Sequence, residues 1–122
     1  MGLRFSEICI DAHDIDALAA WWSSVLGWPA EPTDDGDVVL RAPAGSGPDW
    51  LFLAVPDDKM VKNRIHFDFT PDDQQAEVDR VLALGARHVD IGQGEQTWVV
   101  LADPEGNEFC ILAAEQRPFD YR

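Results

Sequence analysis

Residues 98–112 read W-V-V-L-A-D-P-E-G-N-E-F-C-I-L, and this stretch decides the fold. Two apolar runs, each rich in residues that favour strands, flank a short polar turn. The turn is residues 103–106, where Pro104 fixes its own φ and Gly106 is free to take a positive φ. The stretch therefore predicts a β-hairpin whose two strands are mostly buried.

The first half of the chain repeats this pattern. The spacing V-V-L-x-x-P-x-G occurs at residues 38–45 and again at 99–106, and a helical pattern ending in L-G precedes each copy, at residues 26–27 and 84–85. Each half therefore reads as a strand, a helix and three further strands. Because internal repeats indicate duplicated units, we predict an α+β fold of two βαβββ repeats whose curved mixed sheets surround a cleft.

The length of 122 residues fits one domain, residues 1–122. We place repeat one at about residues 4–56 and repeat two at about 63–114. A short C-terminal tail follows at residues 115–122.

The first strand and helix of repeat one have clear patterns. In residues 4–12, Glu7 and Cys9 alternate with Ile8 and Ile10, and we expect the isoleucines to pack beneath the helix.

The helix itself is predicted over residues 15–26, with Asp14 as the N-cap and Gly27 as the stop. Trp22 lies on its apolar stripe. Trp21 lies off that stripe, and we expect it to contact a loop or a neighbouring subunit.

Repeat two begins with a strand predicted over residues 64–69. His66 and Asp68 share one face of that strand, and apolar side chains that include Ile65 share the other. Thr70, followed by proline, is the expected start of the second helix.

The chain carries 23 acidic and 9 basic residues, a net charge of −14 at pH 7. This charge disfavours nucleic acid and anionic membranes as partners, because both present negative surfaces. It favours solubility first, with a cationic partner as the alternative. The sequence has no run of apolar residues long enough to cross a bilayer and no signal-peptide pattern at its N-terminus. We therefore expect a cytoplasmic protein that binds neither nucleic acid nor membrane.

Cys9 and Cys110 both lie in apolar, strand-like runs. A disulfide is not expected in the cytoplasm. Both residues are predicted to be buried small apolar side chains, with a reactive thiol as the alternative.

Several of these motifs resemble the vicinal oxygen chelate superfamily, which includes glyoxalase I, bleomycin resistance proteins, fosfomycin resistance enzymes and extradiol dioxygenases. The motifs are the repeat itself, S-S-V-L-G-W at residues 23–28 and D-P-E-G-N-E-F at 103–109. K-N-R-x-H-x-D at residues 62–68 is similar to a motif of small bacterial glyoxalase-like domains. The resemblance covers roughly residues 4–114 and implies the glyoxalase-like fold, a small-molecule ligand and a homodimer. It does not imply one reaction, because one fold hosts unrelated chemistries.

The resemblance also implies where a metal would be held. Carried over by position, the ligands of the metal-dependent members fall at Glu7, at His66, at Leu51 or Leu53, and at Cys110, where the superfamily usually has Glu. Leucine cannot bind a metal, so the set is incomplete for an ion that prefers oxygen and nitrogen ligands. We therefore expect no cofactor, with a divalent metal at Glu7 and His66 as the alternative.

Two functions follow from this comparison. The first is a glyoxalase-like protein of unassigned activity that binds a small molecule in the cleft between its repeats without the full metal site, as bleomycin-resistance-like proteins bind a drug. The second is a metal-dependent lyase, isomerase or dioxygenase of the vicinal oxygen chelate type. The five tryptophans suit a flat ligand. The expected ligand-binding residues are Glu7, His66, Asp68, Trp98, Glu108 and Cys110, with Glu108 on the same face as Cys110.

Three roles stay open for His66. It is a metal ligand, a hydrogen-bonded side chain that lines the cleft near Asp68 or Arg64, or a metal-free general base and hence a catalytic residue.

Overall fold

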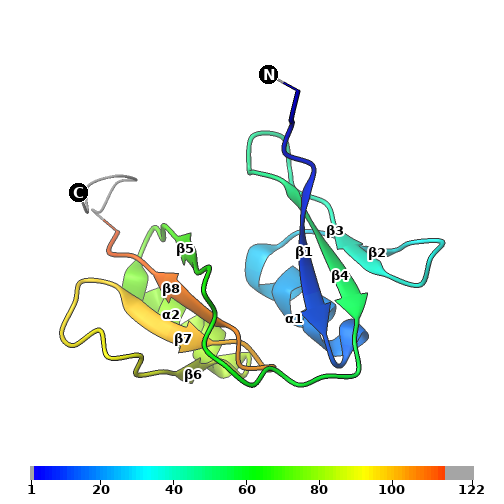
Figure 1. Cartoon of the computed structure of the whole chain (residues 1–122). Coiled ribbons are helices and arrows are strands. Elements are labelled where there is room, and N and C mark those ends of the chain that lie inside the picture. The colour runs from blue at the N-terminus through cyan, green and yellow to red at the C-terminus, as the bar shows by residue number, and fades with distance from the viewer. Residues whose placement is uncertain (1, 115–122) are drawn as a thin grey trace. The chain divides into compact units, whose positions relative to one another are not determined.

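A computed structural model describes residues 2–114, so the predicted tail at 115–122 lies outside the described residues. The chain divides between Asp58 and Lys59 into two compact units, here called unit 1 and unit 2. Each unit contains one four-stranded mixed sheet and one helix (Figure 1). The structure therefore confirms the α+β class and the two βαβββ repeats, whereas the cleft between the repeats stays a prediction.

Unit 1 has the strand order β1-β4-β3-β2. Its elements are β1 (Glu7–Ala12), α1 (Ile15–Leu26), β2 (Ala30–Pro32), β3 (Val38–Leu40) and β4 (Asp49–Ala54). β1 runs parallel to β4, and the other neighbouring strands are antiparallel. The alternation in β1 is as predicted, with Ile8 and Ile10 half-buried and Glu7 exposed. Cys9 shares the exposed face with Glu7, so the prediction that Cys9 is buried was wrong.

α1 begins and ends where the sequence predicts. The side chain of Asp14 accepts a hydrogen bond from Ala17 N, and Gly27 adopts a φ of 71° while its N–H donates to Ser23 O. Trp21 is only 9% exposed, so it does not project from the helix as expected. The ring of Trp21 packs edge-on against Trp22 at 5.0 Å, which buries it although it lies outside the apolar stripe.

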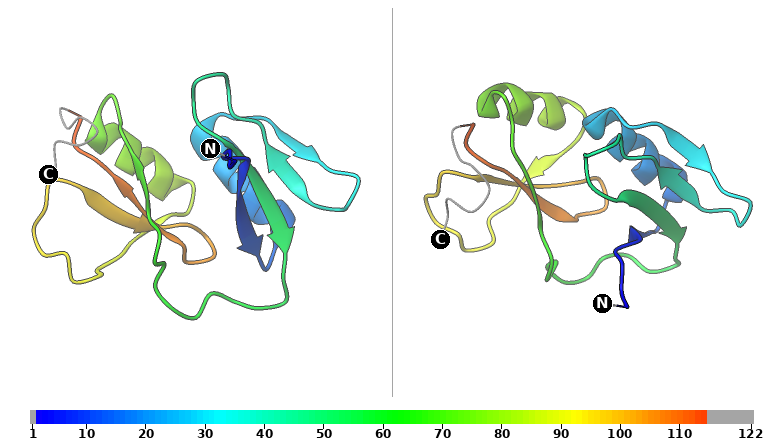
Figure 2. Two further views of the ribbon diagram at one scale, coloured as in Figure 1. Left: turned by 45° about the horizontal axis from the view of Figure 1, so that its top comes forward. Right: turned by 90° about the horizontal axis from the view of Figure 1, so that it is seen from above.

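Aromatic side chains fill the core of unit 1 between α1 and the sheet. Trp50 lies 5.1 Å from Trp22 and 6.0 Å from Trp28, measured between ring centroids. Phe52, two residues along β4, is fully buried on the same face as Trp50. In each unit the helix packs on one face of the sheet (Figure 2). In unit 1 the opposite face is open, since Glu7 and Cys9 on it are exposed and Leu51 is half-buried.

Unit 2 repeats this topology with the strand order β5-β8-β7-β6. Its elements are β5 (Phe67–Phe69), α2 (Gln74–Ala83), β6 (Arg87–His88), β7 (Val99–Ala102) and β8 (Glu108–Ile111). β5 is parallel to β8, and β7 and β8 form the antiparallel hairpin predicted from residues 98–112. Within residues 2–114, neither helix has the length and apolar character that a membrane span requires.

The start of unit 2 differs from the prediction in two places. β5 begins only at Phe67, so His66 lies in the preceding loop and Ile65 is 77% exposed rather than part of the core. The loop departs from strand geometry because side chains, rather than a neighbouring strand, bond to the Asn63 carbonyl. α2 begins at Gln74 and not after Thr70, since the carboxylate of Asp73 accepts from Ala76 N and is the stronger cap.

The turn between β7 and β8 is organised by the buried side chain of Asp103. Its Oδ1 accepts from the backbone N–H groups of Glu105 and Asn107, each at 2.9 Å, and its Oδ2 accepts from Asn107 Nδ2 at 2.8 Å. Gly106 adopts a φ of 89°, which a residue with a side chain rarely adopts. The turn therefore fixes the register of the hairpin through one carboxylate.

Replacing Asp103 by alanine is expected to lower the free energy of unfolding by about 2–4 kcal/mol, because two backbone N–H groups in the turn lose their acceptor. Asp103→Asn keeps an acceptor at Oδ1 and is expected to lose less. Urea unfolding followed by far-UV circular dichroism measures both variants. An alanine variant within about 0.5 kcal/mol of the natural protein would contradict this role.

Candidate functional site

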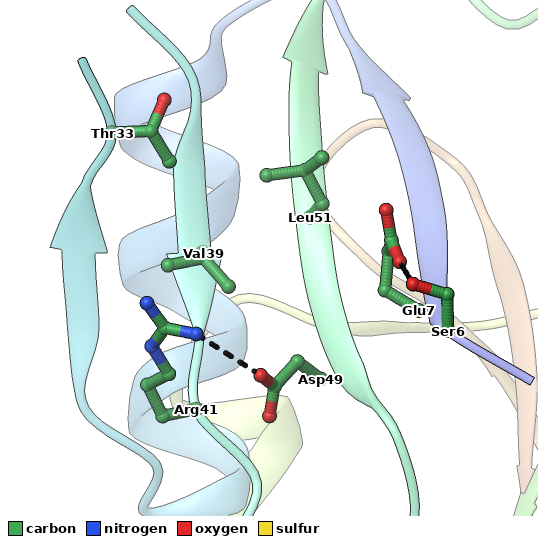
Figure 3. A pocket seen from close by; sticks show the side chains of 7 residues that line it. All are labelled: Ser6, Glu7, Thr33, Val39, Arg41, Asp49 and Leu51. Carbon is green, nitrogen blue, oxygen red and sulfur yellow. Dashed lines mark hydrogen bonds and ion pairs between the residues drawn. The ribbon is translucent and has the colours of Figure 1, made fainter. Parts of the chain in front are cut away.

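The open face of the unit 1 sheet carries a hollow of about 330 Å³ (Figure 3). Its lining comes from the start of β1, from β3 and β4, and from the loops beside them. The lining residues are Ser6, Glu7, Thr33, Val39, Arg41, Asp49 and Leu51. Val39 and Leu51 are register partners on neighbouring strands, so they provide an apolar floor. The charged residues Arg41, Asp49 and Glu7 lie together at one end of it.

Asp49 lies at one side of this floor and makes two charge-assisted contacts. Its Oδ1 accepts from Ala42 N at 2.8 Å, and its Oδ2 accepts from Arg41 Nη1 at 3.2 Å. Arg41 Nε also donates to Glu31 Oε2 at 3.3 Å. The carboxylate of Glu31, followed by that of Asp49, raises the pKa of Arg41, so this guanidinium stays charged.

Glu7 lies beside Asp49, on the neighbouring strand β1 (Figure 3), and accepts a hydrogen bond from Ser6 Oγ. Its backbone is the register partner of Asp49 on the parallel strand β4. Sequence reasoning found Glu7 but missed Asp49 and Arg41. The signal for Asp49 was its position directly before the apolar run of β4, at the end that lies beside Glu7.

In unit 2 the predicted residue Glu108 lies at the corresponding end of β8, and it is 8% exposed. Its Oε2 accepts from Lys59 Nζ at 3.0 Å, and its Oε1 accepts from Asn63 N at 2.8 Å. Burial raises the pKa of this carboxyl, but the Asn63 amide and the Lys59 ammonium together outweigh burial and hold the pKa below its usual value. Glu108 is therefore a buried, ionised carboxylate with its oxygens already bound.

His66 is half-buried in the loop before β5. Its Nε2 lies 2.9 Å from Asn63 O and 2.9 Å from Lys62 Nζ. Lys62 Nζ also donates to Asn63 O at 3.3 Å. Of the three roles left open for His66, these contacts describe a hydrogen-bonded side chain; they do not test its predicted catalytic role.

Cys110 and Asp68 are register partners on β8 and β5. Burial, followed by the charge of Asp68 and the hydrogen bond to it, raises the pKa of the Cys110 thiol to about 11. A thiol with this pKa is protonated at neutral pH and is a weak nucleophile and a weak metal ligand. The structure thus confirms that Cys110 is buried.

The predicted residue Trp98 is half-buried directly before β7. It is not among the residues that line the hollow of unit 1. Its predicted role in ligand binding stays a prediction.

Several of the positions predicted to hold a metal lack a free donor atom. Leu51 lies in unit 1 at the position that corresponds to Cys110 in unit 2, since their register partners are Val39 and Val100, and neither side chain offers a ready donor. The oxygens of Glu108 and the Nε2 of His66 are bound by other groups, including a nearby ammonium in each case. Within residues 2–114, the structure has no group of three or more His, Cys, Asp or Glu side chains placed to hold a metal ion.

This fold of two βαβββ repeats is that of the vicinal oxygen chelate superfamily, and comparison with known families agrees with it. The glyoxalase-like domain family matches residues 7–112, so the chain belongs to that family. A comparison with curated proteins finds no match.

Solved structures with the same fold have diverse activities. The oxidase ChaP-H2 superposes with a TM-score of 0.68 at 19% identity, over 98% of each chain. A glyoxalase/bleomycin resistance protein/dioxygenase family enzyme from Burkholderia phytofirmans PsJN gives a TM-score of 0.63 at 22% identity, over 87% of this chain and 94% of that one. Trypanothione-dependent glyoxalase I from Leishmania major gives 0.65 at 14% identity, over 93% of this chain and 88% of that one. At these identities the likeness shows the fold alone.

The buried ion pair of Glu108 predicts a pH-dependent contribution to stability. Because the folded state lowers the pKa of Glu108, its stabilising effect is full above the unfolded value of 4.5 and is lost as pH falls through the folded value. Glu108→Gln is therefore expected to lower the free energy of unfolding by about 1–2 kcal/mol at pH 7, and by less at pH 3. Urea unfolding at both pH values measures this, with the exposed Glu95→Gln as the control. An equal deficit at pH 7 and pH 3 would contradict the assignment.

The two cysteines are expected to differ sharply in reactivity. Cys9 is exposed, whereas the pKa of Cys110 near 11 leaves about one thiolate in a thousand at pH 8. Iodoacetamide at pH 8 should therefore alkylate Cys9 first and reach Cys110 only after denaturation, as peptide mass spectrometry would show. Cys9→Ser should remove the fast reaction. Equal labelling of both thiols in the folded protein would contradict the burial of Cys110.

Proposed function

We propose that this glyoxalase-like protein binds a small organic cation in the hollow of unit 1. The observation that carries the proposal is the lining itself, an apolar floor of Val39 and Leu51 with the adjacent carboxylates of Glu7 and Asp49 at one end. The volume of about 330 Å³ is at the lower end of the range for small-molecule sites, about 300–1,000 Å³.

The charge balance around the hollow favours a cation over an anion. Three carboxylates, those of Glu7, Glu31 and Asp49, lie in or beside it against the single guanidinium of Arg41. Glu31 and Asp49 already hold Arg41, whereas Glu7 is bound by a neutral hydroxyl. The net charge of −14 adds a field that attracts cations to the whole chain.

The proposal requires no metal. Its chemistry is an ion pair with Glu7 and contact of the ligand's apolar part with Val39 and Leu51. The metal-dependent alternative at Glu7 and His66 would need the Nε2 of His66 to give up its contacts with Asn63 and Lys62. The homodimer, the cytoplasmic location and the part played by the other repeat in binding stay predictions.

Benzamidine and its neutral analogue benzamide form a matched pair of probes for this site. Benzamidine is expected to bind with saturable amide shifts at Glu7, Asp49 and Leu51 in a two-dimensional NMR titration, and benzamide to bind more weakly. Glu7→Gln should weaken benzamidine binding about three- to tenfold, because it removes one charge-assisted contact.

Asp35→Asn is the control for the titration, because it removes one exposed charge outside the lining. It should leave the benzamidine affinity unchanged. Equal affinity for both probes, or an equal effect of Glu7→Gln and Asp35→Asn, would argue against a specific cation site.

A further inference from the structure

Residues 59–66 read K-M-V-K-N-R-I-H and hold three of the nine Lys and Arg residues of the chain. In a protein of net charge −14 this segment is a local exception. We propose that Lys62 and His66, with the charge of Arg64 close by in the chain, form a binding site for a small oxyanion, the phosphate or carboxylate group of a small molecule. This site belongs to unit 2 and is independent of the cation site in unit 1.

The first support is the geometry of the two nitrogens. Lys62 Nζ and His66 Nε2 lie 2.9 Å apart, and both lie within 3.3 Å of the Asn63 carbonyl oxygen. An ammonium has three N–H donors, and these two contacts use at most two of them. At least one donor of Lys62 is therefore free to bind an oxyanion next to the imidazole.

The second support is that Glu108 holds this loop in place. Asn63 N donates to Glu108 Oε1 at 2.8 Å, and Asn63 Nδ2 donates to Glu108 O at 3.4 Å. Lys59 pairs with the same carboxylate. Because the buried Glu108 fixes Asn63, the carbonyl that contacts both Lys62 and His66 is fixed as well. The two nitrogens are thus positioned before any ligand binds.

The third support is the charge count. Residues 59–68 hold three cationic side chains, Lys59, Lys62 and Arg64, and one carboxylate, Asp68, while Glu108 is a second carboxylate in contact with Lys59. Lys59 neutralises Glu108, and Asp68 accepts a hydrogen bond from Cys110. Within residues 59–114 as described, neither Lys62 nor Arg64 forms an ion pair. These five side chains therefore carry one positive charge in excess.

The test follows the imidazole signals of the three histidines by two-dimensional NMR while inorganic phosphate or acetate is added at constant pH and ionic strength. We expect a saturable shift at His66, with smaller and non-saturating shifts at His13 and His88. The tighter-binding probe distinguishes a phosphate-bearing ligand from a carboxylate-bearing one. Uniform, non-saturating shifts at all three histidines for both probes would overturn the proposal.

Variants separate the site from general charge effects. Lys62→Gln is expected to weaken the tighter-binding anion about three- to fivefold, and Lys62→Arg to retain most of the affinity. Arg87→Gln removes an exposed charge elsewhere in unit 2 and should leave the affinity unchanged. Equal losses in Lys62→Gln and Arg87→Gln would show a nonspecific field effect. This assay tests no variant of unit 1. A negative result would therefore overturn the oxyanion site without bearing on the cation site.

Discussion

Each unit depends on a parallel pairing between its first and last strands. β1 pairs with β4 and β5 pairs with β8, and a tight turn cannot join two parallel neighbours. The chain therefore leaves the first strand, passes through a helix and two antiparallel strands, and returns beside its starting point. This path covers one face of the sheet with the helix. The same pairing sets Glu7 beside Asp49 and creates the charged border of the hollow.

The two units use the same position for two different purposes. Asp49 and Glu108 each begin the last strand of a unit, and each accepts one backbone N–H and one cationic side chain. The side chain of Asp49 is 34% exposed, whereas that of Glu108 is 9% exposed. The difference comes from the partners, because Arg41 approaches from β3 and leaves the hollow open, whereas residues 59–63 cover Glu108. The two repeats place a carboxylate at the same position, and the connecting segments determine its accessibility.

Local signals in the sequence were sufficient for most of the fold. The hairpin, the limits of α1 and the repeat all depend on residues close together in the chain, such as Asp14, Gly27 and the turn at Asp103. The failed strand prediction at residues 64–66 depends on a distant partner. Residues 64–66 have a strand pattern, but Glu108 holds Asn63 in a loop.

The candidate site was predicted only in part, because some of its residues come together only through the pairing of distant strands. Glu7, His66 and Glu108 stood out as polar residues in or beside strands. Asp49 and Arg41 did not, because their importance appears only when β3, β4 and β1 are set in register. Trp21 was misplaced because a neighbouring aromatic ring, and not helical spacing, buries it.

The aromatic core has a consequence for optical spectroscopy of this protein. Four of the five tryptophans lie in unit 1, where Trp21, Trp22, Trp28 and Trp50 are linked by ring separations of 5.0–6.0 Å. Rings at this spacing exchange excitation energy and couple their electronic transitions, so the near-ultraviolet signal arises mainly from unit 1. Unit 2 contributes only Trp98. An emission or near-ultraviolet melting curve would therefore follow the first half of the chain, and loss of structure in the second half would pass largely unseen unless the backbone were monitored as well.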